Sequence, residues 1–207
     1  MVTNLRLSPD LSDSPSCGMP TPDELFTQPL PTLVTARLVL RAFAPADAGQ
    51  VQRHLSEGRV AGNTLTIPHP YPVGAAEEFI ASHAPAWAEA KRATWAMTRP
   101  DDGAIVGAIG LVLTRLHQRA EVGYWVALGE WGKGYASAAT RRVISFAFDD
   151  LDLHRVEAHH FIENPASGRV MQHAAMHPEG VHRGVVWRDA RPRDLACYAI
   201  LRTDPRP

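Results

Sequence analysis

The most informative stretch of this chain is Trp131-Gly132-Lys133-Gly134-Tyr135-Ala136. An apolar run at 122–126 precedes it, and a stretch of helical character follows at 136–148. At such a strand-to-helix turn the first N–H groups of the helix lack partners, and the helix dipole adds positive charge. Both features favour a bound phosphate or pyrophosphate, and the two glycines let the backbone approach it closely. The stretch therefore predicts a seat for a nucleotide-bearing cofactor.

Length and composition indicate one globular domain. The chain has 207 residues, 45% of them hydrophobic and 21% charged, so it can bury one substantial core. Its formal net charge of −1 gives no overall attraction to nucleic acid or to an anionic membrane. We therefore expect neither of these among its direct partners.

The N-terminal sequence and the cysteines predict a cytoplasmic protein. No apolar run reaches the length of about 18 residues that a spanning helix needs. Residues 1–20 lack the cationic and apolar segments of a secretory signal. Cys17 and Cys197 lie too far apart to suggest a disulfide framework or a zinc set, so a reducing compartment fits best.

The N-terminal part of the chain is rich in proline and serine, which distinguishes it from the domain that follows. Residues 1–32 are expected to form an N-terminal extension, flexible or draped over the domain, which spans 33–207. Strands are predicted at 35–41, 94–98, 105–114, 121–126, 154–161, 184–187 and 195–202. Helices are predicted at 45–57, at 74–92, at 136–148 and after the N-cap Asn164. This order predicts an α/β fold, a mixed sheet of about seven strands flanked by about four helices.

Three motifs, taken together, resemble a known family. In chain order they are Val122-Gly123-Tyr124-Trp125, the glycine turn at 131–136, and Asn164-Pro165-Ala166-Ser167. The set is similar to the GNAT superfamily of N-acetyltransferases, and more narrowly to its RimJ/RimL-like branch, named for enzymes that acetylate ribosomal protein N-termini. The stretch 35–41 and the loop 68–71 also match that branch, so the resemblance covers roughly 33–202. It implies a single domain with a twisted, mostly antiparallel sheet and a splayed cofactor cleft.

The resemblance also implies acetyl-CoA as the co-substrate and no metal. Amides of the glycine turn would hold the pyrophosphate, and backbone groups at 124–126 would pair with the pantetheine arm and the thioester carbonyl. Asn164 would bind the arm from the other side. The implied cofactor-binding residues are Tyr124, Trp125, Val126, Trp131, Gly132, Lys133, Gly134, Tyr135, Ala136, Asn164 and Ser167. Lys133 would either offset phosphate charge or point to solvent, and Trp131 is expected to pack against the first helical turn.

The sequence departs from the family at two places. Many members carry a tyrosine, the general acid for the leaving thiolate, where this chain has Met171. Ser167 is the candidate acid here, because relatives in this branch tend to have a serine at its position; the alternative is a first-turn hydroxyl with no catalytic task. Members usually end this helix in Leu-Gly-Phe, where this chain has Ala174-Ala175-Met176, and that change bears on the acceptor site more than on the fold.

Acetyl transfer also needs a neutral amine, and the candidate base is Glu121, acting directly or through a water. The alternative is an exposed charge at the end of a strand. An α-amine of pKa ~8 costs under about 1 kcal/mol to neutralise at pH 7.4, whereas a lysine at ~10.4 costs about 4 kcal/mol. One carboxylate therefore favours the α-amine of a protein or peptide N-terminus.

The ten histidines do not predict a metal site. His159 and His160 are adjacent in a predicted strand, so they face opposite sides of the sheet and cannot chelate one ion. His173 and His177 have helical spacing, but the helix is expected to end between them, and no third ligand lies nearby in the sequence.

Two other functions are compatible with the sequence. One is acetylation of a small-molecule amine such as an antibiotic, a polyamine or an amino acid. The other is a CoA-binding regulatory domain without catalysis, which the missing tyrosine leaves open. The acceptor loops, 58–74 and 180–194, would decide between acceptors; arginines in the second loop hint at an acidic acceptor or at the ribosome, or are simply solvated. A ribosomal protein is thus a possible partner, and both a monomer and a homodimer are compatible.

Overall fold

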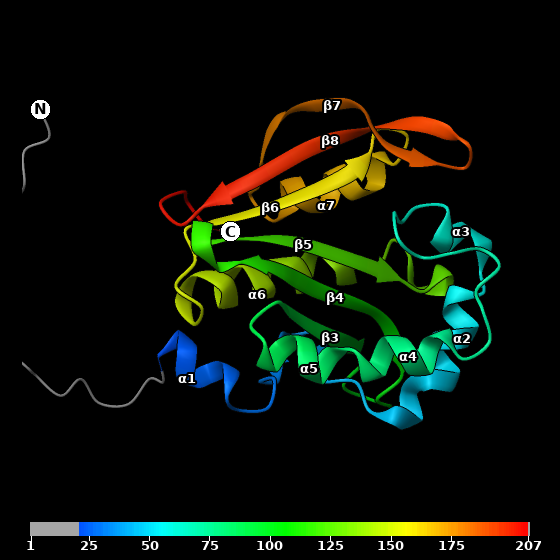
Figure 1. Cartoon of the computed structure of the whole chain (residues 1–207), viewed down its shortest axis with the longest axis horizontal. Helices are drawn as coiled ribbons and strands as arrows, with labels where there is room; N and C mark the ends of the chain where they lie inside the picture. The colour runs from blue at the N-terminus through cyan, green and yellow to red at the C-terminus, as the bar shows by residue number, and fades with distance from the viewer. Residues whose placement is uncertain (1–20, 207) are drawn as a thin grey trace, which may run out of the picture.

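The computed structural model describes residues 21–206, which form an eight-stranded sheet with helices on both faces (Figure 1). The strands are β1 Leu33–Val34, β2 Val39–Arg41, β3 Arg92–Thr98, β4 Ile105–Thr114, β5 Arg119–Val126, β6 Arg155–Phe161, β7 His177–Arg188 and β8 Arg191–Leu201. They lie in the order β1-β2-β3-β4-β5-β6-β8-β7, and every neighbouring pair is antiparallel except β5 with β6. The predicted mixed, mostly antiparallel sheet is confirmed. It has one strand more than predicted because β1, before the predicted strand 35–41, folds back to pair with β2.

The helices are more numerous than the sequence suggested, and those predicted at 45–57 and 74–92 are shorter or divided. They are α1 Pro22–Phe26, α2 Ala48–Leu55, α3 Gly58–Ala61, α4 Ala75–Ala81, α5 His83–Ala88, α6 Tyr135–Asp149 and α7 Pro165–His173, with 3-10 turns at Pro45–Asp47, Arg115–His117 and Leu128–Glu130. The predicted helix 74–92 is divided at Ser82 into α4 and α5. Pro85, which lacks an N–H and is tolerated only in a first turn, lies in the first turn of α5.

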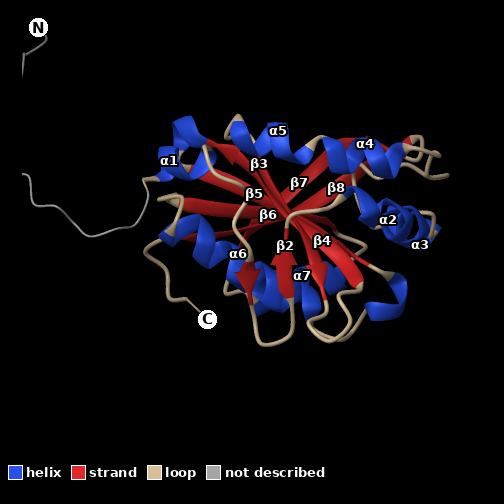
Figure 2. Ribbon diagram, turned by 90° about the horizontal axis from the view of Figure 1, so that it is seen from below, coloured by secondary structure: helices blue, strands red, loops and turns tan. Residues whose placement is uncertain are grey.

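Strand alternation separates two cores on the two faces of the sheet. Trp95 and Ile109 pack with α6 on one face, whereas their chain neighbours Ala96 and Ala108 pack with α2 and α4 on the other. Figure 2 shows α6 and α7 on the opposite side of the strands from α4 and α5. No helix among residues 21–206 combines the length and the apolar character needed to cross a bilayer.

The described part of the N-terminal extension is draped over the domain. Phe26 of α1 is buried against Trp87, with ring centroids 4.6 Å apart. The indole N–H groups of Trp87 and Trp95 donate to the carbonyls of Gln28 and Pro31, both at 2.8 Å. These bonds satisfy two buried donors and attach residues 28–31 to the domain. The rest of the predicted extension, 1–20, lies outside the described residues.

The parallel pair β5 and β6 creates the cleft that positions the site. Only three residue pairs join the two strands, from Arg119 opposite Arg155 to Glu121 opposite Glu157. Beyond that point they diverge, as Figure 1 shows toward the arrowheads of β5 and β6. The C-terminal half of β5 therefore has backbone groups on one side that no neighbouring strand pairs with, which is the predicted splay.

Candidate active site

The glycine turn joins β5 to α6 with two left-handed residues. Gly132 has φ +76° and Gly134 has φ +78°, a region that residues with a side chain rarely adopt. Gly134 is also the N-cap of α6 and provides no side-chain acceptor. Within residues 21–206 no backbone N–H from 132 to 137 donates to a protein acceptor. Six amides are thus available to an anion at the positive end of a fifteen-residue helix.

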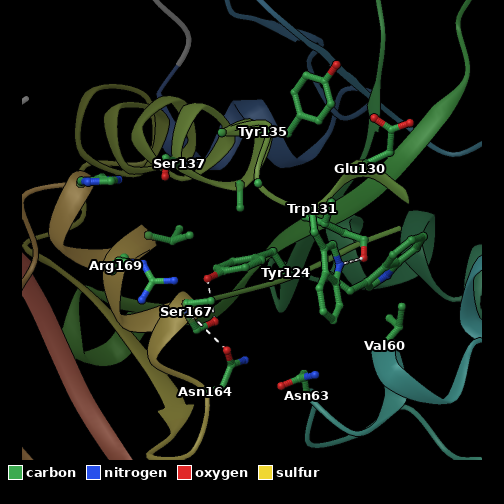
Figure 3. Close-up of a pocket in the computed structure, with 18 of the residues that line it drawn as sticks. Val60, Asn63, Tyr124, Glu130, Trp131, Tyr135, Ser137, Asn164, Ser167 and Arg169 are labelled. Atoms are coloured by element: carbon green, nitrogen blue, oxygen red, sulfur yellow. Dashed lines mark hydrogen bonds between the residues drawn. The ribbon is translucent and has the colours of Figure 1, made fainter. Parts of the chain in front are cut away.

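A cavity of about 330 Å³ opens beside this turn (Figure 3). Its walls come from α3 and the loop after it, the end of β5, the glycine turn with the start of α6, and α7. Of the predicted cofactor-binding residues, only Lys133 does not line the cavity. Those that line it are Tyr124, Trp125, Val126, Trp131, Gly132, Gly134, Tyr135, Ala136, Asn164 and Ser167. The structure therefore brings together predicted residues from Tyr124 to Ser167, which lie 43 positions apart in the chain.

The residues present fit acetyl-CoA. The available amides suit its pyrophosphate, and a Cβ added at Gly132 would meet nothing within 4 Å, so space for the anion exists at the turn. Because β5 and β6 diverge after Glu121, the β6 side of β5 beyond that residue has no strand partner, which suits the amides of a pantetheine arm. Both features lie along the same cavity.

The charged neighbours of the turn differ from expectation. Lys133 forms an ion pair with Glu130 at 2.8 Å, and Glu130 also pairs with Arg99 at 3.3 Å. The lysine is therefore held by a carboxylate rather than directed into the cavity. Trp131 donates its indole N–H to the carbonyl of Val126 at 2.8 Å, and the guanidinium of Arg59 lies 5.3 Å from the centre of its ring. These contacts join Trp131 to the end of β5 and to α3, and the predicted packing on the first turn of α6 stays a prediction.

Two arginines that the sequence did not single out lie near the anion seat. A Cβ at Gly134 would lie 3.1 Å from the guanidinium of Arg37, which also lies over the ring of Tyr135. Arg169 of α7 lines the cavity beside Ser167 (Figure 3). Neither belongs to the ion pairs found within residues 21–206. Only the fold reveals them, because Arg37 is about a hundred residues before the turn.

The first turn of α7 positions the candidate acid. The side chain of Asn164 caps the helix by accepting from the N–H of Ser167, at 3.4 Å. The Ser167 hydroxyl in turn lies 2.8 Å from the hydroxyl of Tyr124 on β5. Burial raises the pKa of Tyr124 to about 12, so this phenol stays protonated near neutral pH. Met171, in the slot where many relatives have tyrosine, is buried in the core, and Tyr124 supplies a phenol from a different element.

The candidate base lies on the other face of the sheet. Glu121 does not line the cavity; it shares a β5 face with Gly123 and Trp125, opposite the face of Tyr124. Its carboxylate lies 3.2 Å from Nδ1 of His159 on β6. The hydrogen bond from His159 holds the pKa of Glu121 below its ordinary value, and the same contact raises the pKa of His159. An amine approaching from this face would thus meet Glu121 across the sheet from the cavity.

The arginines of the second acceptor loop are largely engaged within the protein. Arg188 donates to the carbonyls of Ala61, Leu65 and Ile67, which fastens the β7–β8 hairpin to the loop after α3. Arg193 is buried and pairs with Glu163 at 3.2 Å. Two of the four loop arginines therefore serve internal contacts, which weakens the idea of a basic docking patch.

Comparison with known proteins agrees with this geometry. A model of the acetyltransferase (GNAT) domain matches residues 37–177. The chain is 30% identical to the uncharacterized N-acetyltransferase YoaA of Bacillus subtilis, over 83% of this chain and 97% of that protein. It is 34% identical to "Putative ribosomal N-acetyltransferase YdaF" of the same organism, over 50% of this chain and 57% of that protein.

A solved structure shares the fold. Mycobacterium smegmatis RimJ, in complex with CoA-disulfide, superposes with a TM-score of 0.74 at 22% identity, covering 83% of this chain and 88% of that one. The motifs, the splayed sheet and the relatives agree. The chain belongs to the GNAT family of acetyltransferases and is an N-acetyltransferase that uses acetyl-CoA.

Proposed function

We propose that the protein acetylates the α-amine of a protein or peptide N-terminus. One observation carries the choice of acceptor: Nδ1 of His159 lies 3.2 Å from the carboxylate of Glu121. This hydrogen bond lowers the pKa of Glu121, so the carboxylate is a weak base. A weak base suits an amine that is already partly neutral. An α-amine of pKa ~8 meets that condition near pH 7.4, whereas a lysine of pKa ~10.4 would cost about 4 kcal/mol to deprotonate.

The proposed division of roles follows the two faces of the sheet. Acetyl-CoA supplies a thioester, in which the new C–N bond forms as the C–S bond breaks. Glu121 takes the proton that the amine loses, directly or through a water. On the cavity side, Ser167 gives a proton to the departing sulfur, and the Tyr124 hydroxyl at 2.8 Å gives its own proton to Ser167. Tyr124 then regains a proton from solvent, and Glu121 releases the amine's proton to solvent, so the protons balance. Amides at 132–137 and the cap residue Asn164 hold the donor in place.

The relative named for ribosomal N-acetylation supports this acceptor class, although the match covers about half of each chain. Proteins of the same fold act on other amines: one structural neighbour is named as a spermidine N-acetyltransferase, at 21% identity. The fold alone therefore does not choose the acceptor, and a direct assay must.

Release of free thiol from acetyl-CoA, measured across a panel of amines, tests the proposal. The panel contains peptides with a free N-terminus, the same peptides with a blocked N-terminus and an internal lysine, spermidine, and free amino acids. We expect thiol release with the free N-termini at a kcat/KM at least about tenfold above every other member. A spermidine or amino-acid rate above that of all the peptides would instead assign a small-molecule acceptor.

A further inference from the structure

Three side chains with metal-binding atoms meet on the face of the sheet that carries Glu121. They are His159 of β6, His182 of β7 and Cys197 of β8. One ligand atom from each lies within 4.8 Å of the others. None of the three lines the cavity beside the glycine turn, so the cluster is separate from the cofactor site.

Strand register explains why the three converge. His159 lies directly opposite Cys197, so their side chains project from the same face. On the other side of β8, Gly180 pairs with Cys197, and His182 stands two residues beyond Gly180 on that same face. The rings of His159 and His182 are 5.9 Å apart between centroids. The donors therefore lie on three neighbouring strands, and the pairing of these strands fixes their relative positions.

We propose that His159, His182 and Cys197 form a site for a divalent transition metal, with Zn²⁺ as the best match. Two imidazoles and one thiolate are a ligand set that zinc favours, and three protein ligands leave a fourth position open to water. Bonds of 2.0–2.3 Å to a tetrahedral ion require donor atoms roughly 3.5 Å apart. The present separations need only a modest rotation, which the exposed side chain of His182 can supply.

The surroundings of the cluster support metal binding. Glu121 bonds Nδ1 of His159, which leaves Nε2 for the ion and fixes the ring; a carboxylate in this outer position is typical of zinc-bound histidine. Cys197 is buried, and burial raises the pKa of its thiol. Binding therefore displaces the thiol proton to solvent, and affinity should rise with pH.

Cobalt(II) provides the probe, because a thiolate bound to cobalt gives a near-ultraviolet charge-transfer band and visible bands of tetrahedral intensity. The full chain, kept reduced, is titrated with Co²⁺ and then with Zn²⁺. We expect one equivalent of cobalt to bind with a thiolate band and one equivalent of zinc to displace it. Cys197→Ser should abolish the band, and His182→Gln, a change at an exposed position, should weaken binding by more than about tenfold.

Two control variants make the test specific. Cys17→Ser removes the only other cysteine, and His177→Gln removes an exposed histidine from the same strand as His182. Both should keep the band and the affinity. Absence of the band in the unmodified chain, or its loss in Cys17→Ser with retention in Cys197→Ser, would overturn the site.

Discussion

The hydroxyl of Tyr124 lies 2.8 Å from the hydroxyl of Ser167, and this bond links β5 to α7 across the cofactor cavity. Burial keeps the phenol protonated, since the pKa of Tyr124 is raised to about 12. A pair of neutral hydroxyls at this point can pass a proton to a leaving sulfur. We propose that the pair takes the role of the α7 tyrosine that the family resemblance implies, because that position here holds the buried Met171.

The hydroxyl pair should act as a unit. Ser167→Ala and Tyr124→Phe should each lower kcat by about 10²-fold with little change in KM for acetyl-CoA, because general acid catalysis contributes 10²–10⁴-fold. The double variant should lose scarcely more than either single one, since both belong to one relay. Full multiplication of the two losses, or single variants with normal kcat, would contradict the assignment.

The role of Glu121 can be tested by pH. Glu121→Gln should lower the rate at pH 7 several-fold and lose less by pH 9, because a growing fraction of the amine is then neutral without help. The measurement is the pH profile of kcat/KM for a free N-terminal peptide. If kcat/KM of Glu121→Gln is reduced by the same factor at pH 7 and at pH 9, Glu121 is not the base.

The contact between Glu121 and His159 should also make the free energy of unfolding depend on pH. Its contact raises the pKa of His159 above 6.5, so the histidine's contribution is complete below that value and is lost as the pH rises through its folded pKa. It lowers the pKa of Glu121 below 4.5, so the carboxylate's contribution is complete above that value and is lost as the pH falls through its folded pKa.

Stabilisation by the pair is therefore greatest between pH 4.5 and 6.5. Because half of the Glu121 side chain is exposed, we expect only a few tenths of a kcal/mol, about what surface pairs give. Urea unfolding gives the free energy of unfolding of the unmodified protein and of His159→Gln, with His177→Gln as control. The difference between the first two should be largest in that pH range and should decline on both sides of it. A difference in the free energy of unfolding that stays constant with pH would show that His159 acts through packing.

The left-handed glycines of the turn should matter for donor binding. Gly132→Ala forces φ +76° on a residue with a side chain, at a cost of about 1 kcal/mol, and crowds the anion seat. We expect at least about a tenfold weaker affinity for CoA by calorimetry. Gly129→Ala is the matched control, since that glycine is exposed, three residues earlier, with open space and no left-handed φ. Equal affinities in both variants would argue against an anion seat at the turn.

The helix end after α7 predicts a stabilising substitution. Ala175 adopts φ +58°, the conformation that the glycine of Leu-Gly-Phe would adopt with less strain. Ala175→Gly should stabilise the protein by about 0.5–1 kcal/mol, which denaturant unfolding can measure. Ala174→Gly, at the adjacent buried position with negative φ, should destabilise it instead. Destabilisation of both variants would show that packing of the Ala175 methyl outweighs its strain.

The sequence predicted those parts of the fold that depend on local patterns. The glycine turn and the N-cap at Asn164 appear where their residues indicated them, and each predicted strand has a counterpart, although β2 is shorter than predicted and β7 is longer. The break at Ser82 was missed because the apolar spacing of the predicted helix 74–92 continues across it. The strand β1 was missed because two residues are too few to show alternation.

Only the site residues that belong to contiguous sequence motifs could be predicted. Residues 124–136 and 164–167 form contiguous patterns, so their convergence on one cavity could be anticipated. The bond from Tyr124 to Ser167, the approach of Arg37 to Gly134, and the meeting of His159 with His182 and Cys197 depend on strand register and helix docking. No local spacing encodes such contacts, which is why the sequence indicated no metal ligands in the last three strands.

The most direct test of the central claim uses one peptide that carries both a free α-amine and an internal lysine. The protein is incubated with acetyl-CoA and this peptide near pH 7.4, and tandem mass spectrometry locates the acetyl group. The account predicts acetylation at the α-amine with the lysine unmodified, one thiol being released per acetyl group transferred. Acetylation of the lysine in preference to the α-amine, or no transfer to this and other free N-termini, would contradict it.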